Sequence, residues 1–111
     1  MKRIIFIALA SLISQVAFAA PKECSLRLKT ATSTRSFPIA VVNEAPNETT
    51  YKIVQGGVTV EIIVMESRLG TSTIINIVDT SSRVEVTGIS EALTLSTPAL
   101  QADVTCADLW S

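Results

Sequence analysis

Apolar and polar residues alternate with a period of two along most of the chain after residue 23. The clearest runs of alternating apolar positions lie at residues 24–28, 58–64 and 100–106. Successive side chains of a β-strand point to opposite faces, so this pattern predicts strands with one buried and one solvated face. No stretch gives a convincing pattern for a helix. The chain is therefore expected to be all-β.

Turn signals divide these runs into about eight short strands, spaced roughly every 8–12 residues. Residues 49–96 are expected to form a meander, the polar segment 30–36 a loop, and residues 43–47 a turn or longer loop. Pro38 predicts an edge position or a bulge at the start of the second strand. This spacing of short strands is typical of a small antiparallel sandwich or closed barrel.

The first 19 residues carry the pattern of a secretory signal peptide. Lys2 and Arg3 precede an apolar run at residues 4–13, and small residues stand at Ala17 and Ala19. Cleavage after Ala19 would leave one secreted or periplasmic domain, residues 20–111. No later apolar stretch reaches the roughly 18 residues of a membrane helix, so no membrane span is expected.

Cys24 and Cys106 are the two cysteines of the chain. Outside the cytoplasm they are expected to form one disulfide, with free thiols or an intermolecular bridge as the alternatives. Both share the phase of the apolar residues around them. Antiparallel pairing of the first and last strands would bring the sulfurs together and link the termini; a bridge between two packed sheets also fits.

The residue composition argues against several classes of function. Removing Lys2 and Arg3 leaves seven basic residues against ten acidic ones, a formal net charge of −3 without a basic cluster, so nucleic-acid binding is not expected. The chain has no histidine, which excludes Ser-His and Cys-His nucleophiles and leaves too few ligands for zinc. We predict no catalytic residue, no metal site and no cofactor.

Two carboxylate patterns invite a catalytic interpretation. Residues 77–81 resemble the motif of retroviral-type aspartic proteases, but Ser81 replaces its glycine, so Asp79 is expected to start a hairpin turn. Glu61, Glu66 and Glu85 are expected on the solvated faces of their strands.

These observations predict a non-catalytic domain with a binding or structural role, acting through loops or an exposed sheet edge. The expected partner is an extracytoplasmic protein or a small ligand, and Trp110 is a candidate contact residue. The alternative is a proteinaceous inhibitor of a secreted or periplasmic hydrolase. Such an inhibitor would present a rigid loop, with residues 30–36 or 43–47 as candidates.

Overall fold

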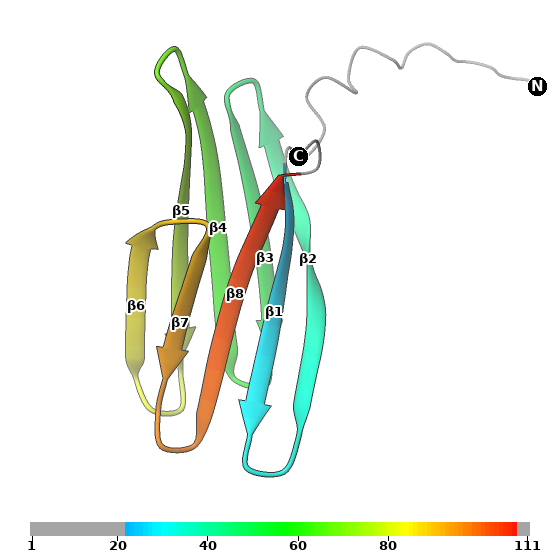
Figure 1. Cartoon of the computed structure of the whole chain (residues 1–111), viewed down its shortest axis with the longest axis vertical. Helices are drawn as coiled ribbons and strands as arrows, with labels where there is room; N and C mark the ends of the chain where they lie inside the picture. The colour runs from blue at the N-terminus through cyan, green and yellow to red at the C-terminus, as the bar shows by residue number, and fades with distance from the viewer. Residues whose placement is uncertain (1–21, 109–111) are drawn as a thin grey trace, which may run out of the picture.

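The computed structural model describes residues 22–108, and these form eight β-strands joined by connections of two to four residues (Figure 1). The strands are β1 (Lys22–Thr30), β2 (Thr34–Ala45), β3 (Glu48–Gln55), β4 (Val58–Ser67), β5 (Gly70–Asp79), β6 (Val84–Ile89), β7 (Ala92–Ser96) and β8 (Leu100–Asp108). Within this range there is no helix that could cross a membrane.

All neighbouring strands are antiparallel, and the sheet order is β6-β5-β4-β3-β2-β1-β8-β7. The first six strands form a meander, β7 pairs with β8, and β8 pairs with β1 over nine residue pairs. The sheet is thus a nearly closed barrel that opens between β6 and β7 (Figure 1). The predicted antiparallel β fold is confirmed. The predicted meander over residues 49–96 is wrong at one connection, because β6 and β7 are consecutive but not paired.

Strand β2 is shared between the two faces of the barrel. Its residues 34–39 pair with β1, its residues 40–45 pair with β3, and the register shifts between Val41 and Asn43. A bulge of this kind bends a strand. Strands β7, β8 and β1 consequently lie in front of β3, β4 and β5 in Figure 1.

Pro38 lies where its missing N–H costs no ladder hydrogen bond. The Thr30 N–H donates to the Ser33 carbonyl at 2.8 Å, which fixes the alternation of hydrogen-bonded pairs between β1 and β2. Pro38 and its partner Ser25 then form a non-hydrogen-bonded pair. The β3 ladder begins only at Ala40, so Pro38 occupies a local edge, as the sequence predicts.

The predicted loop at residues 30–36 is wrong over most of its length, and the predicted turn within residues 43–47 is confined to two residues. Only residues 31–33 connect β1 to β2, and only Pro46 and Asn47 connect β2 to β3. The Thr30 hydroxyl accepts hydrogen bonds from the amides of Thr32 and Ser33, which closes the first turn within three residues. The flanking polar residues have the composition of a loop because they are solvent-exposed, yet they pair in the β1–β2 ladder.

The interior of the barrel is filled with side chains from both faces. Among the described residues Tyr51 is the largest that is fully buried, and Leu26, Ile62, Ile75 and Leu95 are each 0% exposed. These positions follow the period of two in their strands, so they point to the same side of the sheet. Burial of this apolar surface is the main favourable contribution to folding.

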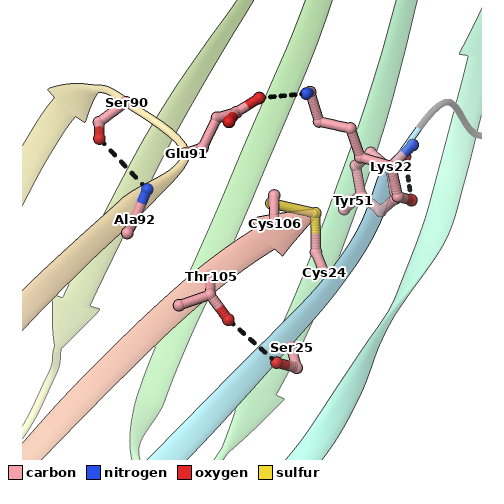
Figure 2. Close-up of a disulfide and its surroundings, with 9 residues drawn as sticks. All are labelled: Lys22, Cys24, Ser25, Tyr51, Ser90, Glu91, Ala92, Thr105 and Cys106. Atoms are coloured by element: carbon pink, nitrogen blue, oxygen red, sulfur yellow. Dashed lines mark hydrogen bonds and ion pairs between the residues drawn. A yellow bond between two sulfur atoms is a disulfide. The ribbon is translucent and has the colours of Figure 1, made fainter. Parts of the chain in front are cut away.

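Cys24 and Cys106 form the predicted disulfide and face the interior (Figure 2). They are direct partners in the β1–β8 ladder, and their Cα atoms lie 4.0 Å apart. Such a short separation is typical of a non-hydrogen-bonded antiparallel pair. The bridge spans 82 residues of sequence and therefore joins the two ends of the described chain.

The double variant Cys24→Ala/Cys106→Ala should lose about 4–5 kcal/mol of unfolding free energy, because the bridge restricts an unfolded chain with a very long loop. Denaturant titration monitored by circular dichroism measures the change. Reducing the wild-type protein should give a similar loss, whereas reductant should not affect the variant. Equal stability of the variant and the oxidised wild type would contradict a stabilising bridge.

Candidate functional site

Of the three residues named from the sequence, two form the disulfide and the third lies outside the described part of the chain. Cys24 and Cys106 are bridged and buried, so they serve the fold. Trp110 lies outside the described residues, as does the expected signal peptide at residues 1–19.

The carboxylates identified in the sequence do not converge. Glu61, Glu66 and Glu85 are exposed; the first two stand five residues apart on β4 and the third stands on β6. Asp79 begins a turn, as predicted: it accepts hydrogen bonds from the Ser81 amide at 3.1 Å and the Ser82 hydroxyl at 2.8 Å. Within residues 22–108 there is no group of three or more potential metal ligands.

The gap between β6 and β7, which we call the seam, is the main irregularity of the barrel. Both strands pair on one side only, and within the described part of the chain no ladder joins them. An edge strand carries a row of backbone donors and acceptors that can pair with another strand. The seam therefore places two such rows beside one another.

The β6 groups that face the seam follow from the β5–β6 register. The Ser90 N–H donates to the Thr73 carbonyl at 2.9 Å, so these two residues form a hydrogen-bonded pair. Because such pairs alternate along an antiparallel ladder, the N–H and C=O groups of Glu85, Thr87 and Ile89 point away from β5 and toward the seam.

The seam-facing groups of β7 follow from the β7–β8 register in the same way. The Cys106 N–H donates to the Glu91 carbonyl at 2.8 Å, which sets the phase of the β7–β8 ladder. The backbone groups of Ala92, Thr94 and Ser96 therefore point toward the seam.

Apolar side chains beside the seam are incompletely buried although they face inward. Val84 is 36% exposed, and Val86 and Leu93 are only partly buried against the core. Leu93 packs over Gly88: a Cβ atom at Gly88 would lie 3.1 Å from Leu93 Cδ1. Side-chain packing therefore brings β6 and β7 together near the connection between them, without a backbone ladder.

The seam is anchored firmly at the connection between its two strands. Ser90 is bonded to β5 through Thr73, and its hydroxyl accepts a hydrogen bond from the Ala92 amide at 3.2 Å (Figure 2). Glu91 accepts a hydrogen bond from Cys106 and forms an ion pair with the Lys22 ammonium. The connection is thus held by β5, β8 and β1.

Lys22 also links this connection to the core through Tyr51. The Tyr51 hydroxyl donates to the Lys22 carbonyl at 2.9 Å and accepts from the Lys22 N–H at 3.2 Å. Burial is the largest influence on the pKa of Tyr51 and raises it; the Lys22 backbone bond and charge oppose this effect, and the charge of Glu44 reinforces it. The pKa of Tyr51 is raised in balance, which favours the neutral phenol in the folded state.

The β7 side of the seam is braced on its outer surface by Asp103. Burial acts to raise the pKa of Asp103, but hydrogen bonds from Thr94 (2.8 Å), Gln101 (3.1 Å) and Arg27 (3.0 Å) together lower it below its usual range. The ionised carboxylate ties β7, β8 and β1 together. Strand β6 is the more exposed of the two seam strands, with four of its six residues exposed.

A second surface is formed by the hairpin tips at one end of the barrel. Figure 1 shows the β2–β3 and β4–β5 hairpins extending past the end of β8. Leu69 at the β4–β5 tip is 98% exposed, and Met65 nearby is 38% exposed. A shallow cavity of about 500 Å³ lies between the hairpins, lined by Pro46, Met65 and neighbouring polar residues.

Comparison with known proteins finds no matching family, no similar curated protein and no similar solved structure. The seam and the hairpin tips are the features of the described residues that bear on function.

The seam is not visible in the amino-acid sequence. Alternation assigns side chains to faces, but it does not identify the lateral neighbour of a strand. Val84 and Val86 alternate in the same way whether or not β6 pairs with β7. The register information needed to find the seam comes from the three-dimensional ladders.

Amide hydrogen exchange should alternate along both seam strands. Seam-facing amides should exchange roughly ten-fold or more faster than the amides bonded to β5 or β8. The fast set is Thr87, Ile89, Thr94 and Ser96, and the slow set is Val86, Gly88, Leu93 and Leu95. Nuclear magnetic resonance resolves each amide, and equal protection of both sets would contradict an open seam.

Tyr51 is the only tyrosine of the chain, so its phenolate absorbance reports a single group. The native protein should titrate at higher pH than the protein in denaturant, because the pKa of Tyr51 is raised by burial. The stability contributed by the neutral phenol is present below the unfolded pKa of about 10 and is lost as pH rises through the folded pKa.

The matched variant is Tyr51→Phe, which removes the hydroxyl and leaves the buried Lys22 backbone groups without this partner. Its unfolding free energy at neutral pH should fall by about 1–3 kcal/mol. The variant should also lack the part of the alkaline stability loss that comes from the phenol. Identical alkaline stability curves for the two proteins would contradict this assignment.

Proposed function

We propose that the mature chain is an exported, non-catalytic binding module that engages another extracytoplasmic protein through the seam. The observation that carries the proposal is the pair of facing edge strands with seam-directed backbone groups. Strand β7 contains no charged residue and no proline, and β6 contains only Glu85. Proteins commonly protect sheet edges with charge, proline or bulges, so these edges suit pairing with a partner.

The other features of the molecule support the same role. The disulfide is compatible with the oxidising environment that the signal-peptide pattern implies. The core residues are tightly enclosed, so the barrel interior does not favour a small-ligand carrier. The separated, exposed positions of Glu61, Glu66 and Glu85 argue against general acid–base catalysis, which requires groups placed around one substrate.

The alternative, a proteinaceous inhibitor of a secreted or periplasmic hydrolase, is favoured by one observation. Leu69 is almost fully exposed on a protruding two-residue turn beside Arg68. An apolar side chain on a rigid hairpin can fill a pocket of a partner protein. The β4–β5 tip is a better candidate for this role than residues 30–36 or 43–47, which lie mostly within strands.

Affinity capture from the native extracytoplasmic fraction tests both proposals. The seam variant Thr87→Pro/Ser96→Pro removes one seam-facing N–H from each edge, and its control, Thr87→Val/Ser96→Ala, keeps both N–H groups. We expect a partner to be captured by the wild type and the control and lost, by at least about ten-fold, with the seam variant. Leu69→Asp should retain capture.

The other outcomes are informative as well. Loss of capture with Leu69→Asp alone, together with inhibition of a captured hydrolase, would favour the inhibitor. Capture unaffected by any of these variants would place the binding surface elsewhere. Turnover of a substrate by the purified domain would overturn the non-catalytic proposal.

A further inference from the structure

We infer that the seam receives an extended segment of the partner protein as an added β-strand, antiparallel to β6 and bearing a basic residue opposite Glu85. This inference rests on the proposed binding role and specifies the chemistry of the partner. Strand addition satisfies backbone donors and acceptors at a sheet edge, while alternate side chains provide specificity.

Strand β6 is the better template of the two edges. It directs the backbone groups of Glu85, Thr87 and Ile89 into the seam. On β7, the Ala92 amide already donates to the Ser90 hydroxyl, so fewer donors remain for an incoming strand. The first contacts of the segment are therefore with β6.

The fixed connection determines where the segment enters. Ser90 and Glu91 are held by Thr73, Cys106 and Lys22, and Leu93 packs over Gly88 close to the same end. At the opposite end Val84 remains 36% exposed although it faces inward. The segment consequently enters beside Val84 and pairs toward Thr87.

The incoming segment needs different side chains on its inward and outward faces. Toward the interior, Val84, Val86 and Leu93 offer incompletely buried apolar surface, which favours apolar residues at alternate positions of the segment. Toward solvent, Glu85 is exposed and presents a carboxylate held by the Asn76 amide at 2.7 Å. A lysine or arginine opposite Glu85 complements this charge, in a domain whose described residues are acidic overall.

A synthetic peptide, acetyl-Thr-Val-Thr-Val-Lys-Val-Thr-amide, matches this pattern and places lysine opposite Glu85 when its third residue faces Thr87. Binding should slow amide exchange at Thr87 and Ile89 in the isotope-labelled protein. The same peptide N-methylated at its first, third and fifth residues should not bind, since it lacks the required donors. Replacing its lysine by glutamate should weaken binding by about two- to five-fold.

The protein-side variant is Thr87→Pro, with Thr87→Val as the matched control because both lose the hydroxyl that accepts from Asn76. Peptide binding should fall at least ten-fold in Thr87→Pro and persist in Thr87→Val. If Thr87→Pro does not fold, the N-methylated peptide still tests the backbone pairing.

Three results would overturn strand addition by a partner. The first is equal binding of the N-methylated and unmodified peptides, and the second is no slowing of amide exchange at Thr87 and Ile89 at about 1 mM peptide. The third is slowing of this exchange when the protein concentration rises without any peptide. The last result, together with a dimer in sedimentation, would identify a second copy of this chain as the occupant. Partner capture that is lost in the seam variant, combined with failure of the peptide to bind, would leave the binding role intact and refute only the addition of a β-strand.

Discussion

The pairing of β1 with β8, fixed by the Cys24–Cys106 bridge, determines where this barrel is open. An eight-stranded meander without that pairing would leave its first and last strands as edges. Here the terminal strands are neighbours over nine residue pairs and are covalently joined. The edges of the sheet therefore fall inside the chain, at β6 and β7.

This arrangement gives the two sides of the seam different mechanical support. Asp103 links β7 to β8 and β1 on the outer surface, and the Lys22–Glu91 pair fixes the connection beside the disulfide. Strand β6 depends mainly on its ladder with β5 and on contacts such as Leu93 with Gly88. The edge most exposed to solvent is thus held beside a rigid frame, an arrangement suited to accepting a strand without loss of the barrel.

Much of the fold follows from the sequence because one face of each strand must be buried. The shared phase of Cys24 and Cys106 with their apolar neighbours predicted an inward-facing bridge, and the side chain of Asp79 forms the expected turn. The prediction of a loop at residues 30–36 was wrong because solvent-exposed strand residues have the same composition as a loop. The seam could not be predicted, since neither alternation nor turn composition states which strands are lateral neighbours.

Scalar couplings across hydrogen bonds report directly whether β6 and β7 are joined by a backbone ladder. Such couplings should connect the Ser90 amide to the Thr73 carbonyl and the Cys106 amide to the Glu91 carbonyl, which lie 2.9 Å and 2.8 Å apart between donor nitrogen and acceptor oxygen. In the free protein none should connect the amides of Thr87 or Ile89 to a carbonyl of β7. Couplings between β6 and β7 would show a fully closed barrel and rule out an open seam.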